Sequence, residues 1–295
     1  NPCMVADIGE MQDRPFVMET AWENTILIGS IPDYGELGGA ITVYHEDENG
    51  KPDFKTYRNL FPNHAIGGLA YKDGKIYVGT TISGGIGIDP VESQAKFAVI
   101  DAKTMAIEKE TILNIPGIGT STAIIGQMSF GPDGLLWACS DKQGTVFAID
   151  TETLEVKKSI STTESDMPAT RRGNYIRWGA DGTMYTNAGY VLSAVDIYNN
   201  TYKNLAKKCT HVAVDPSGNV YYDDKTHIIK LEVSQWERLQ SLIARAERDK
   251  PSDPGAQQAL SAAKAVKQTD SSEAIKGAAQ KLAGYLDTAV KTDVP

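Results

Sequence analysis

Three kinds of side chain in this sequence have the chemistry that proton transfer at an anionic substrate requires. His64 can exchange a proton near neutral pH and could act as a general acid or base, and Tyr34 carries a phenol. Arg171 and Arg172 are the only adjacent arginine pair of an acidic chain, and arginine binds carboxylates and sulfates through paired hydrogen bonds. The catalytic candidates are therefore His64, Tyr34 and Arg171. Each also has a structural explanation, as a hydrogen-bonded loop histidine, a core aromatic ring or an arginine in salt bridges to neighbouring loops.

A second group of residues could contact a ligand without taking part in chemistry. Tyr190 could stack on a sugar ring, while Arg177 alternates with Ile176 and Trp178 in an expected strand and could face inward. Paired carboxylates could form a glycosidase site only if they lie about 5–10 Å apart, which the sequence does not fix. The candidates for ligand binding are Asp33, Asp141, Arg172, Arg177 and Tyr190.

Motifs for metal, cofactor or nucleotide binding are not found in the sequence. His, Asp and Glu residues do not occur at the spacing of a metal site, and there is no GxSxG motif. The glycine stretches at 38–39 and 84–87 do not fit the phosphate-binding pattern GxxxxGK[ST], and neither leads into an expected helix. We therefore expect no metal, cofactor or nucleotide. We interpret these glycines as bends that lead into strands, or as loops that approach a ligand closely.

A repeated unit of short strands must position these residues. Each unit has an apolar strand, a tight turn and a second strand, followed by a variable loop, a third strand and a fourth. Asp-Gly or Ser-Gly between two apolar runs is a hairpin signal, because glycine tolerates positive φ angles. The units begin at FVMETAWENT (16–25), IGGLAYKDGK (66–75), GQMSFGPDGL (126–135), NYIRWGADGT (174–183) and THVAVDPSGN (210–219).

Tandem hairpin units of about 35–60 residues resemble the blades of a β-propeller, which have four antiparallel strands each. The Gly-His and Trp-Asp signatures of WD repeats are missing, so the chain is more similar to divergent propellers, including secreted bacterial ones of the polysaccharide-lyase type. The resemblance implies a mainly β fold with a propeller over residues 1–234. The expected blades are 16–62, 63–117, 118–166, 167–208 and 209–234.

The fifth unit ends after its third strand, HIIKLE (227–232). Residues 3–8 (CMVADI) precede the first unit and could supply the missing strand, which would join the two ends of the chain. Alternatively, the chain is the C-terminal part of a propeller with about six to eight blades, and residues 3–8 complete a blade that begins upstream. The sequence leaves both interpretations open.

The pattern of the sequence changes after Ser234, where apolar residues recur at helical spacing. The stretch 250–255 breaks this helix, a second one is expected at about 256–268, and Ser271 or Ser272 could cap a third at about 272–290. Residues 235–295 are thus predicted to form a tail of three short helices. The tail resembles the FIVAR-type modules of secreted, cell-wall-associated bacterial proteins, and a helical cap packed on the propeller is the alternative.

The propeller resemblance sorts the loops onto two faces. Loops that join second to third strands share a face with the connections between blades, and propellers usually bind their ligands there. The long loops 31–39 and 82–94 belong to this face, with His64 in the connection between their blades. Because Asp33 and Tyr34 lie at the tip of the first loop, we expect a site at these two loops.

The composition of the chain limits the classes of partner and the cellular compartment that we expect. The net charge of −9 argues against nucleic acid, and no apolar run approaches the ~20 residues of a membrane helix. The cysteines Cys3, Cys139 and Cys209 lack metal-ligand spacing, and we expect buried free thiols, although Cys3 could also pair within a longer protein or carry a lipid. A chain that starts at Asn1 rather than Met resembles a mature form or a piece of a longer chain, so its start does not indicate the compartment. We expect a secreted or cell-surface protein from the family resemblances alone.

Two functions fit these features. The first is a non-catalytic propeller that binds a polysaccharide or a surface protein through its loop face. The second is a carbohydrate-active enzyme, either a uronic-acid polysaccharide lyase or a glycoside hydrolase. By analogy with propeller lyases, His64 or Tyr34 would then move the proton and Arg171 would neutralise the uronate carboxylate.

Overall fold

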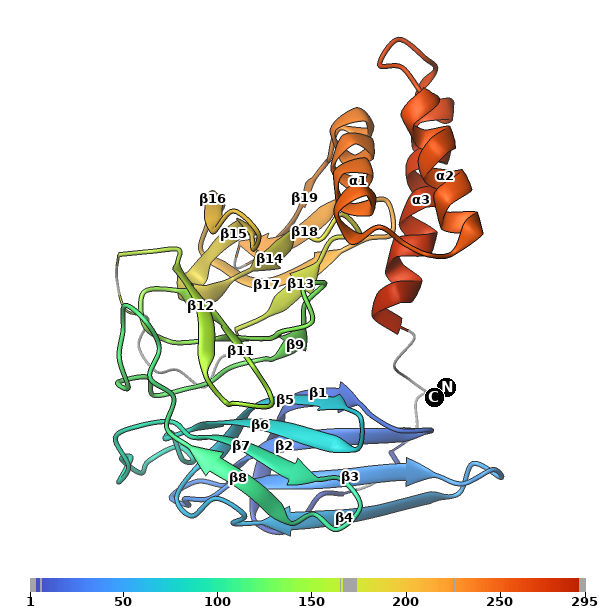
Figure 1. Cartoon of the computed structure of the whole chain (residues 1–295). Coiled ribbons are helices and arrows are strands. Elements are labelled where there is room, and N and C mark those ends of the chain that lie inside the picture. Colours follow the sequence, from blue (N-terminus) through green and yellow to red (C-terminus); the bar gives the residue numbers. More distant parts are fainter. Residues whose placement is uncertain (1–3, 6, 165, 167–173, 225, 292–295) are drawn as a thin grey trace. The chain divides into compact units, whose positions relative to one another are not determined.

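The computed structural model describes residues 4–5, 7–164, 166, 174–224 and 226–291 of the 295-residue chain. These residues form two compact units, of which the first ends at Tyr175 and the second begins at Ile176. Strands dominate the first unit, whereas the second unit combines strands with the α-helices that the structure describes, all of which lie in the C-terminal region (Figure 1).

The first unit contains three four-stranded sheets, and in each of them antiparallel strands follow one another in chain order. The first blade consists of β1 (Gln12–Thr20), β2 (Thr25–Pro32), β3 (Ala40–Glu46) and β4 (Pro52–Arg58). The second blade consists of β5 (Ala65–Lys72), β6 (Lys75–Thr81), β7 (Phe97–Asp101) and β8 (Ile107–Thr111). The third blade consists of β9 (Ser129–Phe130), β10 (Leu136–Cys139), β11 (Thr145–Ile149) and β12 (Val156–Ser161).

The sequence explains these hairpins locally. Asp73 and Gly74 connect β5 to β6 with φ angles of 50° and 75°, as a type I′ turn requires, and the pair Lys72–Lys75 closes the ladder beside them. The inner strands β7, β10 and β11 are apolar along nearly their whole length because both of their faces are buried.

Two apolar clusters hold the blades of the first unit together. Leu27 and Ile41 of the first blade pack with Leu69, Ile76 and Ile100 of the second. A second cluster joins Phe97 and Val99 of the second blade to Leu136, Ala138 and Phe147 of the third. Burial of large apolar side chains on both faces of neighbouring sheets is the main source of stability in such a stack.

The second unit contains two further sheets with the same antiparallel order. The fourth blade consists of β13 (Ile176–Trp178), β14 (Met184–Thr186), β15 (Val191–Asp196) and β16 (Thr201–Lys207), with a short 3-10 helix at Ala188–Tyr190. The fifth sheet has three described strands, β17 (Cys209–Val214), β18 (Val220–Asp224) and β19 (His227–Leu231).

The fourth position of the fifth sheet is not filled by any strand that the structure describes. Residues 4, 5, 7 and 8 lie outside the strands, and the carbonyl of Ile8 accepts a hydrogen bond from Thr56 Oγ1 of β4 at 3.3 Å. The role of residues 3–8 as a closing strand stays a prediction.

Three α-helices follow the sheets: α1 (Gln235–Asp249), α2 (Pro254–Ala265) and α3 (Ser272–Lys291). Each begins at a side chain that accepts a hydrogen bond from a backbone N–H of the first turn. Ser234 Oγ accepts from Glu237 N at 3.4 Å, Asp253 Oδ1 from Ala256 N at 2.8 Å, and Ser271 Oγ from Ala274 N at 3.2 Å. Ser271, rather than Ser272, is therefore the cap of α3.

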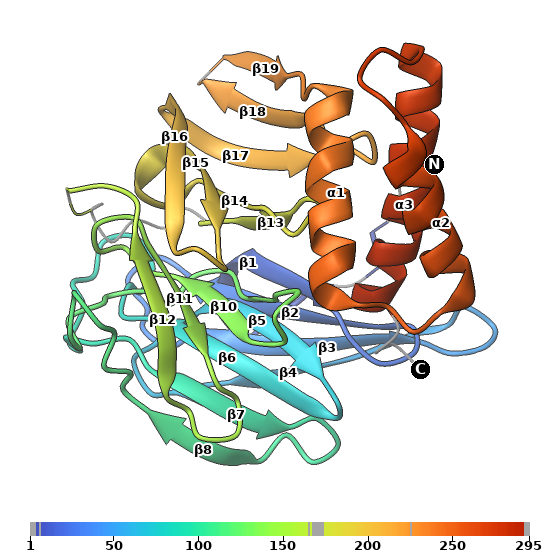
Figure 2. The ribbon, with the colours of Figure 1, turned by 45° about the horizontal axis from the view of Figure 1, so that its top comes forward.

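The three helices lie side by side around a small apolar core (Figure 2). Leu239 and Leu242 of α1, Ala259 of α2, and Leu282 and Leu286 of α3 are buried in it. Within the helices that the structure describes, no segment is both long and apolar enough to cross a membrane.

Two arginines anchor α1 to the sheets of the second unit. Arg238 Nη2 donates to the carbonyl of Pro216 at 2.7 Å, and Arg245 Nη1 donates to the carbonyl of Ala180 at 2.6 Å. Both carbonyls lie in turns between first and second strands, so the helix runs across the hairpin turns of the fourth and fifth sheets.

These observations confirm the predicted fold class, a mainly β protein of the β-propeller type followed by C-terminal helices. Cys139 and Cys209 are buried free thiols, as expected, and Cys3 lies outside the described residues. Burial and the nearby Asp223 carboxylate raise the pKa of the Cys209 thiol to about 12.

Candidate functional site

The two long loops of the first and second blades contact each other through their backbones. Gly35 N donates to the carbonyl of Ile86 at 2.7 Å, and Gly85 N donates to the carbonyl of Glu36 at 2.9 Å. These reciprocal bonds join loop 33–39, between β2 and β3, to loop 82–94, between β6 and β7. We call this pair of loops the loop 33/82 surface.

The glycines of these loops are needed for their close approach. A Cβ atom on Gly85 would lie 1.7 Å from the carbonyl oxygen of Asp33, and one on Gly87 would lie 2.6 Å from the ring of Tyr34. Gly87 also has a φ angle of 83°, which other residues rarely adopt. The glycines at 84–87 are therefore positions where the two loops pack closely against each other, which adds a reason to their interpretation as bends.

Side chains at the base of the surface add to this bracing. Arg58 of β4 forms an ion pair with Glu36 at 3.2 Å, and Asn63 donates to Glu92 at 3.1 Å. Two of the four carboxylates on these loops are thus engaged with the first blade and its connection. The other two, Asp33 and Asp89, are exposed.

His64 is buried between the two blades, with only 1% of its surface exposed. Its Nδ1 lies 2.9 Å from the carbonyl oxygen of Pro62, and its Nε2 lies 3.1 Å from that of Gln94. Its own carbonyl accepts a hydrogen bond from Gly39 N at 2.9 Å. Both ring nitrogens thus face backbone oxygens, and the ring ties the end of loop 82–94 to the connection between the blades.

Tyr34 lies at the opposite extreme of exposure. Its side chain is 76% exposed at the tip of loop 33–39, where its ring packs over Gly87. Ile86 and Val91 of the neighbouring loop are 50% and 64% exposed. Three large apolar or aromatic side chains therefore lie on two loops whose backbones are bonded together.

Asp141 occupies the corresponding loop of the third blade but points inward, with 1% of its surface exposed. Its Oδ1 accepts hydrogen bonds from Thr122 Oγ1 and Ala123 N, both at 2.8 Å, and from Ile124 N at 3.2 Å. The carboxylate therefore holds the connection between the second and third blades.

Four further predicted residues lie outside the first unit or outside the described residues. Arg177 and Tyr190 belong to the second unit, where both are half-buried, and Arg177 Nη1 donates to the carbonyl of Ile176 at 2.8 Å. Arg171 and Arg172 lie outside the described residues. Among the residues that are described, no three His, Cys, Asp or Glu side chains are grouped in a way that could hold a metal ion.

The sequence predicted a site at these two loops, but it did not single out the exposed side chains of Ile86 and Val91. Both lie in a loop rich in glycine and proline, outside any alternating strand pattern, where apolar side chains have no local reason to be buried. The occurrence of Ile86 and Val91 in such a loop is the sequence signal from which their exposure could have been predicted.

No protein-family model matches the sequence, and no curated protein matches it. Solved structures do match in fold. A chain of the mitotic checkpoint complex is 14% identical over 75% of this chain and 62% of its own, with a TM-score of 0.49. The Dos1 propeller is 12% identical over 67% and 48%, with a TM-score of 0.45. The extracellular domain of a one-component system from B. thetaiotaomicron is 13% identical over 75% and 30%, with a TM-score of 0.46.

The chain spans less than two thirds of each of these three chains, at 62%, 48% and 30%. At such low sequence identities and TM-scores, no partner or activity can be transferred from these proteins to this chain. We therefore argue the function from the loop 33/82 surface.

Proposed function

We propose that this chain is a non-catalytic binding module that docks a protein partner on the loop 33/82 surface. The observation that carries the proposal is the exposure of Tyr34, Ile86 and Val91 on loops that are already bonded to each other. Exposed apolar groups on a rigid surface favour association, because little conformational entropy is lost when the partner binds.

The charges of the surface indicate the character of the partner. Loops 31–39 and 82–94 contain four carboxylates and no lysine or arginine. Arg58 compensates the charge of Glu36, but the amide of Asn63 is neutral, so Asp33, Asp89 and Glu92 supply the negative charge that a partner would meet. A partner with apolar anchors and basic groups around them fits this pattern.

A protein fits better than a polysaccharide because two of the three exposed side chains are aliphatic. Sugar rings stack on aromatic faces, and Tyr34 alone offers one on this surface. The resemblance to secreted bacterial propellers and FIVAR-type tails supports a secreted or cell-surface setting.

The alternative function, a uronic-acid lyase or glycoside hydrolase, depends on His64, Tyr34 and Arg171. Burial of His64 and the engagement of both its nitrogens with backbone oxygens weigh against proton transfer to a substrate. The Tyr34 ring packs over Gly87 of the neighbouring loop, and this packing explains its position without a catalytic role.

A photo-crosslinking experiment tests the proposal. A photoreactive phenylalanine analogue replaces Tyr34 in one sample and the solvent-exposed Tyr202 of β16 in a control sample. Both samples are incubated with culture supernatant and with cell-surface extract of the source cells and then irradiated. We expect a protein crosslinked from position 34 and not from position 202. The purified partner should then lose at least about tenfold in affinity for the Tyr34→Ala/Ile86→Ser variant, as for interface anchors elsewhere.

Two outcomes would overturn this function. Saturable binding of a glycan that depends on Tyr34, without any crosslinked protein, would replace the protein partner with a polysaccharide. New absorbance from an unsaturated uronate product, lost in a Tyr34→Phe variant, would make the chain an enzyme.

A further inference from the structure

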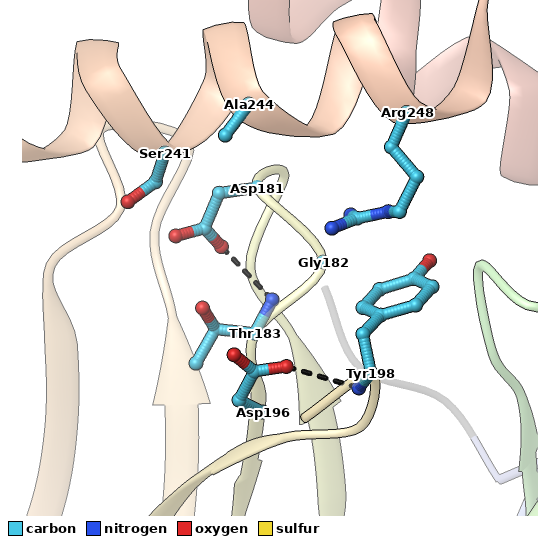
Figure 3. A pocket seen from close by; sticks show the side chains of 8 residues that line it. All are labelled: Asp181, Gly182, Thr183, Asp196, Tyr198, Ser241, Ala244 and Arg248. Atoms are coloured by element: carbon cyan, nitrogen blue, oxygen red, sulfur yellow. Dashed lines mark hydrogen bonds between the residues drawn. The ribbon is translucent and has the colours of Figure 1, made fainter. Parts of the chain in front are cut away.

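A pocket lies within the second unit, between α1 and the two hairpin turns of the fourth blade (Figure 3). Its volume is about 160 Å³. Asp181 and Thr183 come from the turn between β13 and β14, and Asp196 ends β15 just before the turn that contains Tyr198. Ser241 and Arg248 come from α1. We call it the blade-four pocket.

The charges around this pocket leave one negative charge uncompensated. Two carboxylates, Asp181 and Asp196, line the pocket with one guanidinium, Arg248, which lies 3.4 Å from the centre of the Tyr198 ring. Arg248 also pairs with Asp249 at 3.5 Å, and Asp249 pairs with Arg245 at 3.0 Å, so three carboxylates meet two guanidiniums. The hydroxyls of Thr183 and Ser241 add neutral hydrogen-bonding groups. This lining suits a ligand with a single positive charge and further hydrogen-bond donors.

The two carboxylates differ in how their oxygens are used. Asp196 Oδ1 accepts from the backbone N–H groups of Tyr198 at 2.9 Å and Asn199 at 3.1 Å, and its Oδ2 accepts from Asn199 Nδ2 at 2.8 Å. Burial tends to raise the pKa of Asp196, but the bonds from Asn199 and Tyr198 and the charge of Arg248 outweigh it and lower that pKa. Asp181 Oδ1 accepts from Thr183 N at 3.0 Å, whereas its Oδ2 accepts no hydrogen bond from the residues that the structure describes.

In the third blade, the aspartate at the equivalent position accepts hydrogen bonds from the chain itself through both of its oxygens. Asp133 is the equivalent of Asp181, since each precedes a glycine in the turn between the first and second strands. Asp133 Oδ1 accepts from Leu135 N at 3.3 Å and Trp137 Nε1 at 3.0 Å. Its Oδ2 accepts from the ammonium of Lys158 at 3.0 Å.

Strand register identifies the matching lysine in the fourth blade. Lys158 pairs with Ala148, which pairs with Trp137; Lys203 pairs with Ala194, which pairs with Tyr185. Lys203 is exposed, and the described structure contains no ion pair between it and Asp181. Asp181 lines the pocket and keeps an oxygen that accepts no hydrogen bond from the described residues, whereas the corresponding oxygen of Asp133 accepts from a lysine ammonium.

We propose that the blade-four pocket binds a primary ammonium group, which donates to Asp181 Oδ2 as Lys158 donates to Asp133. The alkyl chain next to the ammonium packs against Ala244 and the Tyr198 ring, and Thr183 and Ser241 accept its remaining N–H groups. A cavity of about 150 Å³ holds a benzene-sized molecule, so the ligand is a small alkylamine or the end of a lysine side chain.

Titration of the ¹⁵N-labelled full chain with n-butylammonium chloride tests this site. We expect saturable shifts of the backbone amides of Gly182, Thr183 and Ser241, and none with 1-butanol, which has the same shape without the charge. Asp181→Asn should weaken binding at least about tenfold, because hydrogen bonds between charged groups are worth that much or more. The matched control Asp133→Asn should change the affinity less than about twofold, because Asp133 does not line the pocket and sites without shared partners act independently.

A second variant protects the test against misfolding of Asp181→Asn. Ala244 is exposed on α1, so Ala244→Leu should fold normally and fill the pocket, abolishing the shifts. Equal shifts with 1-butanol, shifts that survive either variant, or no saturable shifts at these amides would overturn the proposal. N-acetyl-lysine methylamide separates the two sources: tighter binding than n-butylammonium indicates a partner's lysine, and weaker binding indicates a free amine.

Discussion

In the first and the third blade, the loop that joins the second strand to the third carries an aspartate near its start, but the two aspartates have different surroundings. In the first blade, Asp33 is exposed at the tip of a long loop that is braced by backbone hydrogen bonds to loop 82–94. In the third blade, the loop between β10 and β11 is short, and Asp141 turns inward to hold residues 122–124. A loop that its neighbour braces through the backbone leaves its side chains available to a partner, whereas a short loop uses its side chain as the brace.

Removing the brace of the third blade should have the largest effect on stability. Asp141→Ala leaves the N–H groups of Ala123 and Ile124 buried without their acceptor, and we expect a loss of about 3 kcal/mol in the free energy of unfolding. Urea denaturation followed by circular dichroism measures it. Asp33→Ala is the matched control, because exposed substitutions usually change stability by less than about 0.5 kcal/mol. Equal losses in the two variants would contradict the comparison.

Separating the two braced loops should cost somewhat less. The Cβ of Gly85→Ala would overlap the carbonyl oxygen of Asp33, so the loops must move apart, at an expected cost of about 2 kcal/mol. Gly35→Ala is the control, since it has open space around its Cβ and a φ angle of 77°, and only backbone strain of about 1 kcal/mol opposes it. Thermal unfolding of both variants should rank Gly85→Ala below Gly35→Ala, and the reverse order would show that the loop contact is not what holds the surface.

Substitution of His64 distinguishes a brace from a catalytic group. His64→Ala removes two contacts to backbone oxygens, and we expect a loss of about 1.5 kcal/mol in the free energy of unfolding. Binding of the crosslinked partner should persist, because the ring does not reach the surface. A variant that keeps its stability but loses turnover on a uronic-acid polysaccharide would restore the enzymatic function.

The sequence predicted the blades and helices well because both depend on local signals. The Asp73-Gly74 turn and the cap at Asp253 are determined by residues a few positions apart. The positions of the two long loops follow from the repeat, and the site on them stays a prediction, whereas the structural contacts of His64 and Asp141 depend on how closely neighbouring blades approach. The blade-four pocket escaped prediction for the same reason. Its aspartates read as ordinary turn residues, and nothing local shows that α1 crosses them.

Substitutions of the exposed side chains on the loop 33/82 surface should change the free energy of unfolding far less than Asp141→Ala does. Tyr34→Ala and Val91→Ser remove side chains that are 76% and 64% exposed, and we expect each to change the free energy of unfolding by less than about 0.5 kcal/mol. Tyr34 carries the sharper test, because its ring packs over Gly87 and could contribute to the loop contact itself. If Tyr34→Ala costs as much as Gly85→Ala, the ring is part of the brace and the loop 33/82 surface is a structural contact. If the fold is unchanged while partner affinity falls, the two loops are held by their backbones and the exposed side chains serve binding.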